Sequence, residues 1–140
     1  LHTMVLGYYH LPDSIRILTI AIFIYSIVIA WFKDIPDMAG DQKFDIKTLS
    51  LRIGSKTVFI FGNTLLALVF VFLISASLFF KLELNTTLFI VMHILMLLAL
   101  IYKAVKTDVN NKTAISKYYQ FIWVLFFAEY IVFAIASISA

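Results

Sequence analysis

The sequence predicts an all-α, polytopic transmembrane helix bundle, and three observations support this fold class. Hydrophobic residues make up 63% of the 140 positions and charged residues only 14%, whereas a soluble domain is nearer half apolar and a quarter charged. Four segments are long and apolar enough to cross a bilayer, which takes about 20 residues of helix. None of the four alternates between apolar and polar residues, as a half-buried strand would.

The four expected spans are joined by polar or charged connections, and they cover residues 15–32, 57–80, 84–102 and 118–140. The third span contains His93, and the fourth carries Glu129 near its middle. Ionisable groups at that depth are costly and usually face the interior of the bundle. We therefore favour hydrogen-bonded packing roles for Glu129 and His93 over a polar lining of a cavity. Asn63 of the second span is expected to bond between helices.

The basic residues are distributed unevenly between the two sides of the expected membrane. Because successive spans alternate in direction, the first and third connections share one side, and they hold nine of the 11 Lys and Arg residues. Only Arg16 and Lys81 belong to the other side. The positive-inside rule then predicts that the long first connection, residues 33–56, faces the cytoplasm or the stroma of a plastid. The net charge of +3 follows from this topology and indicates no nucleic-acid partner.

Two further features limit what the chain can be. It contains no cysteine, which excludes a disulfide framework, thiolate metal ligands and thiol catalysis. It begins at Leu1 without the basic and apolar regions of a signal peptide. We therefore expect the amino-terminal part of a larger protein to precede it.

The first connection concentrates the acidic residues. Residues 33–54 read KDIPDMAGDQKFDIKTLSLRIG and hold four of the eight acidic side chains. Asp34, Asp37 and Asp41 have the spacing D-x-x-D-x-x-x-D, which places them on one face of a helix, where like charges repel. A hard divalent cation such as Mg²⁺, bound with substrate phosphates, would relieve this repulsion; the alternative is a solvated charged loop. Interleaved basic side chains could contact the same phosphates, namely Lys33, Lys43, Lys47 and Arg52.

Pro36 is expected to shape this connection. A proline disfavours the α conformation of the residue before it, which here is Ile35. The first span should therefore break or kink near Asp34, and Pro36 should begin a new short helix, where its missing N–H costs nothing. Gly40 would either let a ligand approach the backbone of that short helix or serve as a turn glycine.

The stretch FKDIPDMAGDQKFDIKTLSLRIG resembles the second aspartate-rich motif of the UbiA superfamily of intramembrane aromatic prenyltransferases. Asp34, Asp37 and Asp41 fall on the acidic positions of that motif. The order Lys33 to Asp37 followed by Gly40 and Asp41 looks most like the homogentisate prenyltransferases of tocopherol and plastoquinone synthesis. The segment YYQFIWVLFFAEY, residues 118–130, also resembles the last helix of that group.

The resemblance implies a fold of nine transmembrane helices around a cavity that opens to lipid. Residues 1–140 would supply the last four helices, as the carboxyl-terminal part of one membrane-embedded domain. The first motif of the superfamily, N-x-x-x-D-x-x-x-D, does not occur in these residues. We therefore expect this chain by itself to be inactive. The expected location is a bacterial membrane, for instance a cyanobacterial plasma or thylakoid membrane, or a plastid membrane.

The resemblance also implies the reaction and its residues. A phytyl, geranylgeranyl or solanesyl group would pass from a polyprenyl diphosphate to homogentisate, in an enzyme that uses Mg²⁺. The expected catalytic residues are Asp34, Asp37 and Asp41, of which Asp37 and Asp41 would bind the metal. Positive charge stabilises a diphosphate as it leaves. The resemblance and the loop charges together make three basic residues candidate diphosphate contacts, namely Lys43, Lys47 and Arg52.

Two alternative functions stay open at this stage. One is another branch of the same superfamily, such as chlorophyll synthase or a menaquinone or ubiquinone prenyltransferase. The other is a small membrane protein that binds a divalent cation without being an enzyme. A cation carrier would align acidic residues along its spans, and only Glu129 has such a position, so this second alternative is disfavoured.

Overall fold

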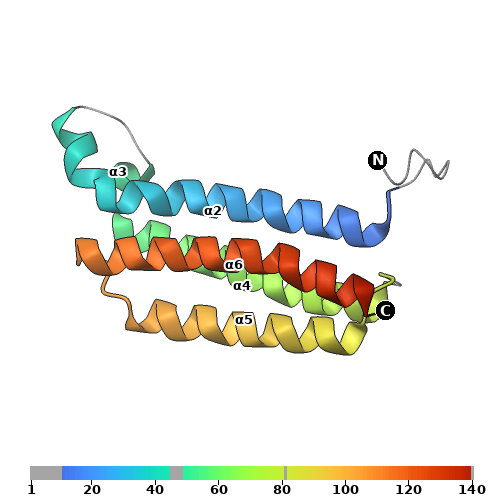
Figure 1. The fold of residues 1–140 in the computed structure, drawn as a ribbon. Helices are drawn as coiled ribbons and strands as arrows, with labels where there is room; N and C mark the ends of the chain where they lie inside the picture. Colours follow the sequence, from blue (N-terminus) through green and yellow to red (C-terminus); the bar gives the residue numbers. More distant parts are fainter. Residues whose placement is uncertain (1–10, 45–48, 81, 140) are drawn as a thin grey trace.

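The computed structural model describes residues 11–44, 49–80 and 82–139. Within these ranges the chain forms helices and no strand: α2 (Asp13–Lys43), α3 (Leu49–Ile53), α4 (Ser55–Phe79), α5 (Thr86–Lys106) and α6 (Lys112–Ile138). The four long helices run side by side, and each reverses the direction of the one before it (Figure 1). All four contain a stretch long and apolar enough to cross a membrane. The predicted all-α, polytopic transmembrane bundle is confirmed.

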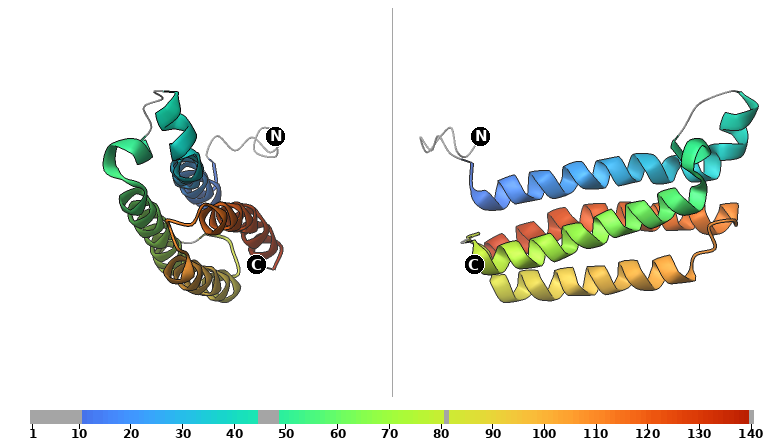
Figure 2. Two further views of the ribbon diagram at one scale, coloured as in Figure 1. Left: turned by 90° about the vertical axis from the view of Figure 1, so that its left-hand side faces the viewer. Right: turned by 180° about the vertical axis from the view of Figure 1, so that it is seen from behind.

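The helices form a ring in which α2 contacts α4 and α6, and α5 contacts the same two neighbours. Seen along the bundle, α2 therefore lies across from α5 (Figure 2). Short α3 packs against both α2 and α4 at one end of the ring. The apolar side chains that face inward from all four long helices make one continuous core.

The starts of α5 and α6 differ from the predicted spans, and in both a capping asparagine marks the first turn. The Asn111 side chain accepts a hydrogen bond from the backbone N–H of Ala114 at 3.0 Å, so α6 begins at Lys112, well before its apolar stretch. Asn85 caps α5 in the same way through the N–H of Leu88. A side-chain oxygen at this position satisfies one of the unpaired N–H groups of the first helical turn.

The expectation was a break or a kink near Asp34 and a new helix from Pro36; the break and the new helix were wrong, whereas a bend is present in the last turns of the helix (Figures 1 and 2). The α2 helix continues through this proline to Lys43, and no separate helix begins there. Phe32 and Ile35 are buried in the core, so tertiary packing holds the turn before the proline in the helical conformation. The direction of the chain changes only near the end of α2, which turns away from the bundle (Figures 1 and 2). Gly40 lies within this helix, and the structure does not describe the contacts around it.

The two ends of the bundle differ in charge. Arg16 lies at the end where α2 begins, whereas the opposite end holds eight described basic residues: Lys33, Lys43, Arg52, Lys56, Lys103, Lys106, Lys112 and Lys117. Lys47 and Lys81 lie outside the described residues. The first and third connections therefore share one side, as predicted. Which compartment this basic end faces stays a prediction.

Candidate functional site

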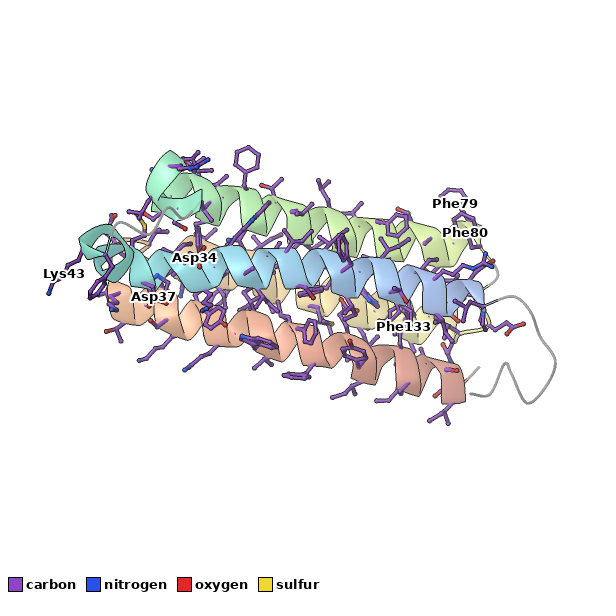
Figure 3. The ribbon with its side chains drawn as sticks, turned by 90° about the horizontal axis from the view of Figure 1, so that it is seen from above. Asp34, Asp37, Lys43, Phe79, Phe80 and Phe133 are labelled. Atoms are coloured by element: carbon purple, nitrogen blue, oxygen red, sulfur yellow. The ribbon has the colours of Figure 1, made fainter. Side chains whose placement is uncertain are left out.

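The candidate site lies where α2 reaches the basic end of the bundle. Asp34 is half-buried and Asp37 is exposed, one turn apart on the same helix. Both lie near the end of α2 that also carries Lys43, far from Phe79 and Phe80 at the other end of the molecule (Figure 3). Asp41 belongs to the last turns of the same helix, but its side chain is outside the described set.

The predicted diphosphate contacts come from two different elements. Lys43 is exposed in the last turn of α2 and extends away from the bundle (Figure 3). Arg52 is exposed in the last turn of α3, which packs against α2. Lys47 lies outside the described residues. The fold thus brings Arg52 to the end of the bundle that carries Asp34, Asp37 and Lys43.

The donor set at this end fits a hard divalent cation. Among the side chains that are described, no group of three or more His, Cys, Asp or Glu residues lies close enough to hold a metal ion. Mg²⁺, however, commonly uses one or two carboxylates together with substrate phosphates and water. Asp34 and Asp37 supply two carboxylates from successive turns at an accessible helix end.

An aromatic cluster packs around the turn of α2 that precedes Asp34. Phe32 of α2, two residues before Asp34, stacks on Phe59 of α4 with ring centres 5.7 Å apart. Tyr118 of α6 meets the edge of Phe32 at 5.8 Å and lies 4.8 Å from Phe59. Aromatic pairs at these distances contribute beyond the area that they bury. Two helices, α4 and α6, therefore hold the segment of α2 that leads into the acidic residues.

Gly62 and Asn63 of α4 complete this cluster. A methyl group at Gly62 would overlap the ring of Phe32, so only glycine lets α2 and α4 approach this closely. The Tyr118 hydroxyl donates a hydrogen bond to Oδ1 of Asn63, whose Nδ2 donates to the carbonyl of Phe59 at 2.8 Å. The predicted hydrogen bond between helices at Asn63 is confirmed.

A second polar cluster is buried in the interior of the bundle. The Tyr25 hydroxyl donates to Oε1 of Glu129 at 3.4 Å, and Nε2 of His93 lies 3.1 Å from Oε2. All three side chains are fully buried. The packing roles predicted for Glu129 and His93 are confirmed, because both side chains are hydrogen-bonded and neither is exposed.

Some residues at these sites were not singled out from the sequence. Tyr25, Tyr118 and Phe32 belong to the high aromatic content of the spans, where position alone did not distinguish them. A tyrosine within an apolar span is a usable signal, because its hydroxyl needs a partner there. Ser50 of α3 gave no signal; it is fully buried, and its hydroxyl has no hydrogen-bond partner within the described part of the chain.

The fold and the site define a class of protein: a membrane-embedded helix bundle with paired carboxylates and basic side chains at one end. The family model of the UbiA prenyltransferase family matches residues 3–125. The chain therefore belongs to the UbiA prenyltransferase family, as its aspartate-rich motif predicted. A divalent metal is what this family generally uses.

Curated relatives of the chain include several prenyltransferases. The chain is 41% identical over 128 residues to a homogentisate phytyltransferase of Synechocystis sp.; the aligned region covers 90% of this chain and 41% of that protein. It is 36% identical over 121 residues to the chloroplastic homogentisate solanesyltransferase of Arabidopsis thaliana, a region that covers 85% of this chain and 31% of that protein. Naringenin 8-dimethylallyltransferase 2 of Sophora flavescens is 38% identical over 119 residues, covering 85% and 29%.

The chain thus spans less than half the length of each of these curated relatives. No solved structure matches it significantly. The relatives support a prenyltransferase, and the helices support an integral membrane protein with several spans.

Proposed function

We propose that this chain forms the second aspartate-rich half of a Mg²⁺-dependent aromatic prenyltransferase. In this proposal it is the carboxyl-terminal part of one nine-helix membrane domain and is inactive alone. The observation that carries the proposal is the acidic end of α2, where Asp34 and Asp37 lie at the basic end of a bundle that belongs to the UbiA family. The basic end would face the cytoplasm or the plastid stroma.

The donor is proposed to be a polyprenyl diphosphate with a phytyl, geranylgeranyl or solanesyl chain, and the acceptor homogentisate. The 41% identity to a homogentisate phytyltransferase supports this acceptor. The bilayer would be a bacterial plasma or thylakoid membrane or a plastid membrane, since the relatives include cyanobacterial and chloroplastic proteins.

In the proposed reaction, Asp37 and Asp41 bind Mg²⁺ and Asp34 is the third acidic member of the site. The bound metal supplies positive charge beside the diphosphate. Lys43, Lys47 and Arg52 hold the phosphate oxygens and stabilise the charge that they gain. The allylic C–O bond breaks with its electron pair left on the diphosphate, the prenyl carbon bonds to a ring carbon, and that ring carbon releases its proton to water.

A second acceptor class is also supported by a specific observation. The chain is 38% identical to naringenin 8-dimethylallyltransferase 2, close to the 41% that it shares with the homogentisate phytyltransferase. It is also 32% identical to a 2-acylphloroglucinol 4-prenyltransferase of Humulus lupulus. Another electron-rich phenol is therefore the second candidate acceptor.

The test uses membranes from a host that produces the whole protein to which this chain belongs. The membranes are incubated with Mg²⁺ and labelled phytyl, geranylgeranyl or solanesyl diphosphate, together with either homogentisate or naringenin. We expect a prenylated product with homogentisate. Product with naringenin alone would support the second candidate, and no product with any pair would refute the proposed function.

The role of the aspartates is tested in the same membranes by Asp37→Asn. Asp108→Asn is the matched control, because Asp108 is also an exposed carboxylate at the basic end but lies in the turn between α5 and α6. We expect the control to retain activity and Asp37→Asn to lose it. Equal activity of the two variants would remove Asp37 from the site.

A further inference from the structure

Tyr25, His93 and Glu129 form one hydrogen-bonded network that joins three helices. One carboxyl oxygen of Glu129, on α6, accepts a hydrogen bond from the Tyr25 hydroxyl of α2. The other oxygen is hydrogen-bonded to His93 of α5. The α2 and α5 helices lie across the ring from each other (Figure 2). Glu129 therefore connects two helices that are not neighbours.

The hydrogen-bond directions in the network follow from the partner of Nδ1. That nitrogen of His93 lies 2.7 Å from the backbone carbonyl oxygen of Phe89. A carbonyl can only accept, so Nδ1 carries a hydrogen and donates it. In a neutral imidazole Nε2 is then an acceptor. With that neutral imidazole, a neutral carboxyl group at residue 129 would offer an acceptor to the Tyr25 hydroxyl and a donor to Nε2. With an imidazolium, an ionised carboxylate would accept from both partners.

Aromatic rings enclose the network. Phe70 presents an edge contact to both Tyr25 and His93, each at 6.2 Å between ring centres. Phe126 lies 6.1 Å from Tyr25, and Phe133 lies 6.2 Å from His93. A polar group that loses its partner in such surroundings has no water to replace it. Rotation or sliding of α2 would therefore break hydrogen bonds that nothing nearby can remake.

The network and the candidate site share one helix. Tyr25 precedes Asp34 by nine residues, a rise of roughly 14 Å along α2 at 1.5 Å per residue. The intervening residues form uninterrupted helix. A change in the rotation or depth of α2 at Tyr25 is therefore transmitted to Asp34 and Asp37.

We propose that Tyr25, Glu129 and His93 are positioning residues that fix α2 against α5 and α6 and so hold the aspartates in place. This inference rests on the proposed prenyl transfer. We take the network in its neutral form, in which residue 129 supplies one acceptor and one donor.

The variants that test this inference are matched in size and position. Glu129→Gln keeps an oxygen for Tyr25 and supplies an amide N–H for Nε2 of His93. Glu129→Leu leaves both partners unpaired. Tyr25→Phe removes a single hydroxyl group. Ser26→Ala is its control, because the Ser26 hydroxyl donates within α2 itself, to the carbonyl of Ile22 at 2.8 Å.

The first readout is kinetic and uses the folded fraction of the whole protein in membranes. We expect Glu129→Gln and Ser26→Ala to stay within about twofold of the wild-type kcat/KM for the prenyl diphosphate, and Glu129→Leu to lose about ten- to a hundredfold. A purely structural role would lower the amount of folded protein and leave its kcat/KM unchanged, which would overturn the inference. An equal loss in Glu129→Gln and Glu129→Leu would overturn it too.

If Glu129→Leu yields no folded protein, Tyr25→Phe against Ser26→Ala decides the same question. We expect Tyr25→Phe to lower kcat/KM of the folded fraction several-fold, with Ser26→Ala unchanged. Equal kcat/KM in these two variants would contradict a positioning role.

The second readout needs no enzyme activity. The 140 residues contain no cysteine. With any cysteine elsewhere in the whole protein replaced by serine, Lys33→Cys on α2 and Lys106→Cys on α5 can carry a pair of spin labels. In vesicles we expect Glu129→Leu to broaden or shift the distance distribution and Glu129→Gln to leave it as in wild type. An unchanged distance distribution in Glu129→Leu would refute the positioning role. If Glu129→Leu shifts the distribution but the wild type shows no prenyl transfer, only the proposed function is refuted.

Discussion

The two ends of α2 carry the same acidic residue type in opposite electrostatic settings. At its start, Asp13 lies at the positive pole of the helix dipole and accepts a hydrogen bond from Arg16 at 3.2 Å. Further along, Asp34 and Asp37 lie one turn apart, nine and six residues before the end of the helix. The first arrangement pairs its carboxylate with a cation, whereas the second places two like charges on one helix face.

Asp13 is paired with Arg16 through one exposed ion pair within a single turn. Asp34 and Asp37 repel each other as like charges on one face, and Mg²⁺ together with the basic side chains of the same end of the bundle would offset that repulsion. The comparison therefore separates a carboxylate that only begins a helix from carboxylates that form a candidate site.

The largest expected effect comes from replacing Asp37, with replacement of Asp13 at the other end of α2 as the comparison. We expect Asp37→Asn to lower prenyl transfer at least a hundredfold, in the range found when one electrostatic contact to a transition state is removed. Asp13→Asn should leave the rate within about twofold, because the Asp13–Arg16 pair is exposed. Product formation in membranes measures both. Similar losses at the two ends would show that the comparison has no functional meaning.

Removal of the metal is the next largest effect. We expect EDTA to abolish prenyl transfer in the wild type, since the paired carboxylates then have no cation to share with the diphosphate. Added Mg²⁺ should restore the rate. Helix content measured by circular dichroism should stay the same throughout, because the buried apolar core holds the four long helices together and not the metal. Activity that persists in EDTA would contradict a divalent metal at Asp37 and Asp41.

A smaller effect is expected from Gly62→Ala, which changes the contact between α4 and α2 two residues before Asp34. The added methyl group overlaps the ring of Phe32, and overpacking of this kind costs about 1–3 kcal/mol of stability. Thermal unfolding in detergent measures it, with the exposed Thr64→Ala of the same helix as a control. An unchanged unfolding temperature would mean that α2 moves away from α4 without cost.

The smallest effect is expected at the start of α2. Arg16→Ala removes an ion pair whose side chains are about half exposed, and such pairs contribute about 0–1 kcal/mol. The same unfolding measurement should show a shift smaller than that of Gly62→Ala. A larger shift would reveal a structural role for the Asp13 end.

Much of the fold could be predicted because membrane spans depend on local composition. The four spans, the shared side of the first and third connections and the family resemblance of the aspartate motif all follow from short windows of sequence. The break at Pro36 could not be judged in this way. Burial of Phe32 and Ile35 against other helices outweighs the local preference of the residue before a proline.

The acidic pattern of the site could likewise be predicted, but not its supporting contacts. Asn63 meets Tyr118 across 55 positions of sequence, and Tyr25 meets Glu129 across 104. Each bond depends on which faces of two helices meet, and no periodicity in either helix records its partner.

The membrane bundle, its basic end and the acidic spacing on α2 follow from the residue order, because hydropathy, charge and helical periodicity act over one or two turns. Packing between helices is what lets α2 continue through Pro36, places Phe32 against Gly62 and links Tyr25 to His93 through Glu129. These features arise where helices from distant parts of the chain pack together, since burial there makes each close contact and each hydrogen bond depend on its partner.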